Sequence, residues 1–214
     1  MSFSLNEVDG MAKRATRGAG YSWGIAEEAG KATRALSAHG LDGSGLLAGL
    51  LERSSQLSPG DLTPQNTEAD WNGAAGLLCP LMAGTTLADY ASRIGPREIA
   101  IDQVLYPALI IPFAVNAARQ IKATLALTWT DIRVVCSGSA FSVQGPDKAL
   151  NVATCDRLTL RQGGDVGTPL TRQSRATPAP ADWATLGSFA HRTYAPATDA
   201  SRLSGAGAGL SDND

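Results

Sequence analysis

The segment Gly18-Ala-Gly-Tyr-Ser-Trp-Gly24 separates two stretches of helical periodicity near the start of the sequence. Glycine ends helices and forms tight turns readily because it has no side chain to restrict its backbone. We therefore expect one helix to end at Gly18 and the next to begin at Ser22, whose hydroxyl can cap its first amides. Tyr21 and Trp23 flank that serine, and aromatic residues in such a connection usually pack the two helices together. They are also candidates for the walls of a ligand pocket, since many binding sites combine aromatic walls with a few polar groups.

Helical patterns extend on both sides of this turn. The stretch Ser4-Leu-Asn-Glu7 has the composition of a capping box, which starts the first helix. The second helix is expected to run from Ser22 to near His39, with Gly40 as its C-terminal cap. Ala26 and Gly30 are small, so another helix can approach closely there.

The second helix also carries a predicted ion pair, because Glu27 and Lys31 stand four residues apart. A third helix is expected over residues 44–53. The polar, proline-containing stretch 54–70 then predicts a surface loop.

The middle of the chain changes from helical periodicity to alternation. The apolar run 77–82 is expected to form a short buried strand, and Pro112 to open a helix that continues to Ile121. Residues 123–129 and 157–161 alternate between apolar and polar, and short turns separate the apolar runs between them. Strands joined by short turns indicate antiparallel pairing, and helices followed by strands indicate an α+β fold.

The predicted architecture is a single α+β domain over residues 1–214. Its N-terminal helical layer occupies 1–54, and a mainly antiparallel sheet with short helices occupies 97–162. A C-terminal helix and a glycine-rich tail occupy 180–214. A chain of 214 residues is long enough to bury a sizeable core. We expect the tail to dock on the rest of the fold.

Composition narrows the functional classes. The net charge is −2 without a run of basic residues, which argues against nucleic-acid binding. No apolar run approaches the roughly 18 residues that span a bilayer, which argues against a membrane protein. The absence of a secretory signal and three widely spaced cysteines, Cys79, Cys136 and Cys155, predict a cytoplasmic protein with reduced thiols. Charged residues make up only 18%, so part of the surface is a candidate contact between copies in a homo-oligomer.

Two nucleotide-binding motifs fail on spacing. The glycines of Gly18-x-Gly-x-x-x-Gly24 are one residue too far apart for a dinucleotide fingerprint, and a helix precedes them where the motif needs a strand. The stretch from Gly24 to Lys31 has one residue too many for a phosphate-binding loop and ends in Ala32, where that motif needs serine or threonine. Anion binding by the first amides of the second helix stays open. The sequence specifies no cofactor.

The remaining candidate site residues lie mostly near the end of the chain. His39 is expected at a helix C-terminus, where the carbonyl end of the helix favours positive charge. His191 in the last predicted helix is a candidate general base. Asp212 and Asp214 are candidate catalytic groups and weak candidate ligands for magnesium or calcium, which prefer carboxylate oxygens; no other metal site is indicated. Arg202 is a candidate clamp for an anionic substrate.

Both ends of the sequence resemble an uncharacterised bacterial family, one of the domain-of-unknown-function groups with chains of similar length. The resemblance is carried by SLNEV at 4–8 and GAGYSWGIAEEAG at 18–30, and by SRLSGAGAGLSDND at 201–214. It implies no activity and no catalytic residue.

Two functional hypotheses follow, together with a scaffold role that needs no ligand. The first is a metabolic enzyme acting on a small carboxylated molecule, with its site where the Gly18–Gly24 turn meets the docked tail. Tyr21, Trp23 and Arg202 would bind the substrate there. The second is a non-catalytic subunit or ligand-binding module of a metabolic complex. The sequence leaves open whether the protein is an enzyme at all.

Overall fold

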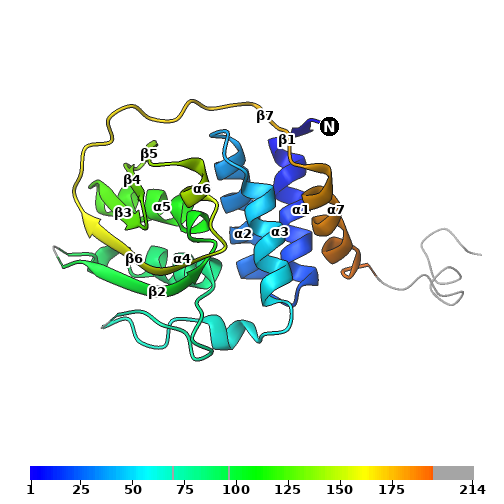
Figure 1. The fold of residues 1–214 in the computed structure, drawn as a ribbon, viewed down its shortest axis with the longest axis horizontal. Coiled ribbons are helices and arrows are strands. Elements are labelled where there is room, and N and C mark those ends of the chain that lie inside the picture. The colour runs from blue at the N-terminus through cyan, green and yellow to red at the C-terminus, as the bar shows by residue number, and fades with distance from the viewer. Residues whose placement is uncertain (69, 96, 195–214) are drawn as a thin grey trace, which may run out of the picture.

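The computed structural model of the chain describes residues 1–68, 70–95 and 97–194. Its helices fall into two groups on either side of the molecule (Figure 1). One group is a helical layer of α1 (Leu5–Gly18), α2 (Trp23–Ser37), α3 (Gly43–Ser54) and α7 (Pro180–His191). The other group, α4 (Pro80–Asp89), α5 (Ile111–Ile121) and the short α6 (Asp147–Leu150), lies with the main sheet.

Five antiparallel strands form the main sheet, in the order β2-β6-β3-β4-β5. They are β2 (Ile99–Leu105), β3 (Leu125–Trp129), β4 (Ile132–Cys136), β5 (Phe141–Gln144) and β6 (Thr154–Gln162). Two short strands, β1 (Phe3–Ser4) and β7 (Arg175–Ala176), form a separate antiparallel pair. Most of the helical layer comes before the antiparallel sheet in the chain, which confirms the predicted α+β class. The predicted docking of the tail concerns residues 195–214, which lie outside the described residues.

The helix starts follow the sequence closely. Ser4 Oγ accepts a hydrogen bond from the Glu7 amide at 3.2 Å, and the Ser4 amide donates to Glu7 Oε2 at 2.7 Å, so the predicted capping box is confirmed. Ser22 Oγ accepts from the Ile25 amide at 3.4 Å and caps α2. The two helices therefore begin where their capping residues predict.

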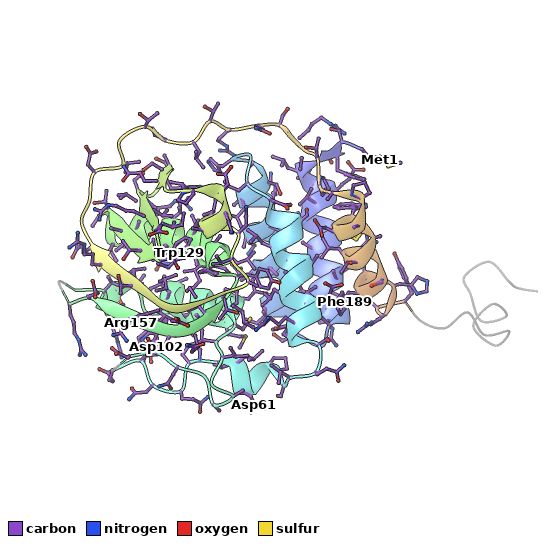
Figure 2. The ribbon with its side chains drawn as sticks, in the orientation of Figure 1. Met1, Asp61, Asp102, Trp129, Arg157 and Phe189 are labelled. Atoms are coloured by element: carbon purple, nitrogen blue, oxygen red, sulfur yellow. The ribbon has the colours of Figure 1, made fainter. Side chains whose placement is uncertain are left out.

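Two glycines let helices approach α1 closely. A side chain at Gly30 would place its Cβ 2.7 Å from Asp9 Oδ1 and 3.0 Å from the Asp9 carbonyl oxygen, which confirms the predicted close approach on α2. A Cβ at Gly18 would overlap the carbonyl group of Phe189 on α7. Figure 2 shows Phe189 in the helical layer. Gly18 thus ends α1 and also makes room for the last helix.

Two local predictions were wrong, one about the chain between α3 and α5 and one about α2. Residues 77–82 are not a strand, because Pro80 begins α4; proline suits the first turn of a helix, where its missing amide hydrogen is not needed. Of these residues, only Leu78 pairs with the sheet, through an isolated bridge to Val104.

The predicted ion pair of Glu27 with Lys31 in α2 is also absent. Glu27 binds Lys13 of α1 at 2.7 Å, and Lys31 binds Glu28 at 2.6 Å.

The core joins the sheet to the helices. Trp129 on β3 is 2% exposed, and its indole Nε1 donates to the Ala149 carbonyl at 3.2 Å (Figure 2). Helix α5 packs against β3 and β4 on one side and against α2 and α4 on the other. On the exposed surface of the sheet, Arg157 forms ion pairs with Asp102 at 2.9 Å and Asp70 at 2.7 Å.

A long connection, residues 163–179, runs from the end of β6 across the molecule to α7 (Figure 1). We call it the strap. The Leu170 amide donates to the Phe141 carbonyl at 3.0 Å, and the Gln173 amide donates to the Ala38 carbonyl at 2.7 Å. The strap is therefore attached both to the sheet and to the end of α2, and β7 near its end pairs with β1. Within the described ranges, no helix is both long and apolar enough to cross a bilayer.

Candidate functional site

A groove of about 350 Å³ lies where α2, α5, the β4–β5 turn and the strap meet. Its apolar lining includes Phe113 of α5 and Phe141 of β5, which are only 3% and 2% exposed and so belong to the core as well. The groove therefore combines a rigid aromatic floor with walls from segments far apart in the sequence.

The walls of the groove are strongly basic. Four basic side chains line it, against one acidic side chain: Lys31 and Arg34 from α2, Arg119 from α5, Arg172 from the strap, and Glu28 from α2. Glu28 is neutralised by Lys31, and that hydrogen bond is the main reason that the pKa of Lys31 is raised. The three arginines leave an excess of positive charge in a protein whose net charge is −2.

The arginines differ in how they are held. Arg119 is fixed, because its Nε donates to the Gly138 carbonyl at 2.7 Å and its Nη1 donates to Asn116 Oδ1 at 3.1 Å. The guanidinium groups of Arg34 and Arg172 make no hydrogen bond or ion pair with any residue in the described part of the chain. Two of the three therefore present free donors to a ligand.

His39 lies at the C-terminal end of α2 and also lines the groove. Its Nδ1 is 2.8 Å from the Ala35 carbonyl oxygen, which agrees with the prediction that it serves the carbonyl end of this helix. Its ring lies 4.6 Å from the ring of Phe141 at an angle of 55°. The imidazole is thus held at one edge by the helix and on one face by the aromatic floor.

A second hollow, of about 200 Å³, is acidic. Asp42 and Asp182 line it together with Tyr106. Burial is the main cause that raises the pKa of Asp182, and repulsion by Asp42 and Glu52 raises it further. The two hollows therefore favour ligands of opposite charge, and the basic groove also contains two phenylalanine rings and a histidine. In the described ranges, no three His, Cys, Asp or Glu side chains gather to hold a metal ion.

Tyr21 belongs to the core. It is 2% exposed, its hydroxyl donates to Ser54 Oγ at 3.2 Å, and it lies 3.5 Å from Cys79 Sγ. Burial raises the pKa of both the Tyr21 phenol and the Cys79 thiol. Tyr21 therefore packs inside the core and does not line an open pocket.

Trp23 and His191 lie on the surface, away from the groove. The Trp23 side chain is 54% exposed, with Lys13 Nζ 5.8 Å and the Arg17 guanidinium 5.4 Å from its ring centre. His191 is exposed and packs edge-on against Tyr194, with ring centres 5.5 Å apart. The structure does not bring either residue to the groove.

The other predicted site residues, Arg202, Asp212 and Asp214, lie outside the described residues, and their roles stay predictions. Cys79, Cys136 and Cys155 are buried and unpaired with one another. Burial raises the pKa of Cys136 and of Cys155 to about 12, so neither is a ready nucleophile.

The groove residues form no recognisable motif. Long stretches of chain separate the three arginines, Arg34, Arg119 and Arg172. In the sequence, nothing distinguishes any of them from an ordinary surface arginine. The one local signal is the pattern of α2, whose inward stripe of apolar residues leaves Arg34 facing outward. The groove itself becomes visible only when α5 and the strap are placed against α2.

Fold and groove together define an α+β protein with a basic, aromatic-floored groove. Residues 3–78 match the model of a family described as "Protein of unknown function (DUF3726)". The matched part contains the Gly18–Gly24 turn and the α2 side of the groove, which agrees with the resemblance of the opening motif to an uncharacterised domain family. Arg119 and Arg172 lie outside it. No curated protein matches the sequence.

Proposed function

We propose that this protein binds a small carboxylated molecule in the basic groove, as the substrate of a metabolic enzyme. The proposal is carried by three arginines that line the groove. Among the described lining residues Glu28 is the one carboxylate, and it is already paired with Lys31. This places the site between α2, α5 and the strap, in place of the Gly18–Gly24 turn.

The chemistry of the lining supports a carboxylate ligand. An arginine guanidinium offers parallel donors that match the two oxygens of a carboxylate, and Arg34 and Arg172 have donors free of described partners. Arg119 is held in place by Gly138 and Asn116, so little side-chain entropy is lost when it binds. The rings of Phe113 and Phe141 offer an apolar surface to the carbon part of the ligand.

Removing the two free arginines together is expected to weaken carboxylate binding by about a hundredfold or more, since each hydrogen bond to a charged group contributes about 1.5–3 kcal/mol and about 1.4 kcal/mol is tenfold in affinity. The test is titration calorimetry of the Arg34→Gln/Arg172→Gln variant with tartrate, a dicarboxylate, beside the unaltered protein. Tartrate serves as a probe of the ligand class.

The matched control is Arg133→Gln/Arg161→Gln, which removes two arginines from the sheet, away from the groove. It has the same change in net charge and is expected to bind as the unaltered protein does. Equal weakening in both double variants would show a general charge effect and refute a specific site. Absence of tartrate binding in all of them would refute the proposal outright.

A non-catalytic subunit is the second candidate role, and one surface favours it. Trp23 and Tyr194 are 54% and 56% exposed, and both lie against α1: Arg17 stacks on Trp23, and Arg14 donates to the Tyr194 hydroxyl at 2.9 Å. Tryptophan, tyrosine and arginine are the residues that contribute most to binding at protein interfaces.

If this surface joins two copies of the chain, Trp23→Ala/Tyr194→Ala is expected to lower the measured mass from dimer to monomer. Size-exclusion chromatography with light scattering measures this directly. The variant loses only exposed rings, so its circular dichroism should match that of the unaltered protein. A monomer at every concentration before mutation would contradict a homo-oligomer.

A further inference from the structure

His39 is the one histidine among the described residues that line the groove, and histidine is the side chain best suited to exchange a proton with a ligand. We infer that His39 contacts the anionic group of the ligand through Nε2, and that binding is accompanied by uptake of a proton on that nitrogen. This inference rests on the proposed function and adds a specific role for one residue.

The hydrogen bond to α2 decides which nitrogen is available. A carbonyl oxygen can only accept, so Nδ1 must carry the hydrogen in the 2.8 Å contact with Ala35. In the neutral ring, Nε2 then holds a lone pair and no hydrogen. In the imidazolium, both nitrogens carry hydrogens. The state of Nε2 therefore reports directly whether the ring is charged.

The two states interact with a carboxylate in opposite ways. A neutral His39 turns a lone pair toward the ligand's oxygens and gives no attraction. The imidazolium donates a charge-assisted hydrogen bond from Nε2. Contact with Phe141 limits the ring's freedom to turn away, since the rings lie 4.6 Å apart. A bound carboxylate therefore favours the protonated form.

The surrounding charges make this coupling stronger. On its own helix, His39 shares the groove with Glu28, Lys31 and Arg34, and the Glu28–Lys31 pair is close to neutral. Arg119 lines the same groove from α5 and Arg172 lines it from the strap. The arginines attract a carboxylate into the groove, and a bound carboxylate favours the charged form of a histidine beside it.

Linkage then fixes the direction of the pH effect. Because the complex holds one proton more than the free protein, affinity is highest at low pH and falls as pH rises. Where His39 is neutral in the free protein and charged in the complex, the dissociation constant rises by up to about tenfold for each pH unit. The same Nε2 can return the proton to a bound ligand or take one from it, which is the role of a general acid or base.

The experiment measures tartrate binding by calorimetry at about pH 6 and about pH 8, on either side of the usual histidine range. Titrations in two buffers of different ionisation enthalpy count the protons taken up. The variant is His39→Gln, whose amide can still donate to the Ala35 carbonyl. The control is His191→Gln, which removes the only other histidine of the sequence.

The unaltered protein and His191→Gln are expected to bind tartrate about tenfold more tightly at the lower pH, with proton uptake. His39→Gln is expected to bind at both pH values with one affinity and no uptake. Nitrogen-15 spectra of the free protein should show His39 protonated on Nδ1 alone when neutral, which also verifies that the fold is intact.

Three results would overturn the inference. Equal affinity at both pH values, or a pH effect that survives in His39→Gln, removes the role of His39 while leaving carboxylate binding in place. Loss of tartrate binding only in Arg34→Gln/Arg172→Gln then still supports the proposed function. Absence of tartrate binding under every condition would refute both the proposed function and the role of His39, because no bound anion would then contact His39.

Discussion

Alanine in place of Gly18 is expected to lower the free energy of unfolding by about 3 kcal/mol, the upper range for forcing one methyl group into a packed site. The added Cβ would overlap the backbone carbonyl of Phe189, and a backbone group cannot move aside as a flexible side chain does. Either α7 shifts away from α1 or the end of α1 unwinds. Urea unfolding followed by circular dichroism measures the loss.

The same turn supplies two internal controls. Gly24 lies in the first turn of α2 with nothing within 4 Å of its would-be Cβ, so Gly24→Ala is expected to be neutral or to stabilise by up to about 1 kcal/mol. Gly20 also has open space but a φ of +100°, so alanine there costs about 1–2 kcal/mol through backbone strain alone. Equal effects at Gly18 and Gly24 would contradict the close packing of α1 on α7.

The second large effect is expected at Gly84 of α4. A Cβ there would overlap the ring of Phe113, a residue that also lines the groove. Gly84→Ala is expected to cost about 1–3 kcal/mol of stability, because the ring must move or α4 must retreat from α5. Movement of the ring also narrows the groove, so tartrate affinity should fall together with stability.

A pair of further variants separates packing from general damage. Phe113→Leu should partly restore the stability of Gly84→Ala, since a smaller side chain makes room for the new methyl group. Gly187→Ala inside α7 has nothing within 4 Å of its Cβ, so it should stabilise by up to about 1 kcal/mol and leave binding unchanged. Additive losses in Gly84→Ala/Phe113→Leu would contradict direct contact between the two positions.

Local signals in the sequence predicted the helical layer well. Ser4 with Glu7, and Ser22 at the end of the glycine turn, are capping patterns whose partners lie three residues away, so no tertiary information is needed to find them. The alternation of 123–129 similarly placed β3. The run 77–82 misled because a short apolar stretch suits a strand or a buried helix equally, and the position of Pro80 favours the helix.

Strand β2 was missed for a physical reason. The strand Ile99-Ala-Ile-Asp-Gln-Val-Leu105 has two adjacent polar residues between apolar stretches, so it shows neither strict alternation nor a continuous apolar run. Its register with β6 is the same on both sides of Gln103, since Asp102 faces Arg157 and Val104 faces Cys155. Its sequence alone therefore resembles irregular chain.

The groove could not be predicted from the sequence, because its residues come together only in the folded molecule. The sequence correctly placed His39 at the end of a helix. It could not show that His39 also lies beside Phe141 and shares a groove with Arg172, because both residues are more than a hundred positions later in the chain. Tyr21 shows the converse. Its place beside a glycine turn left open both packing between helices and a pocket wall, and the structure encloses it with Ser54 and Cys79.

The pairing of β1 with β7 and of α1 with α7 has a consequence for synthesis. A ribosome makes a chain from its first residue onward, so the first helix emerges long before its neighbours on α7 exist. Phe3 pairs with Ala176, and the end of α1 at Gly18 packs on Phe189. The face of α1 that packs on α7 therefore stays uncovered until α7 has been translated.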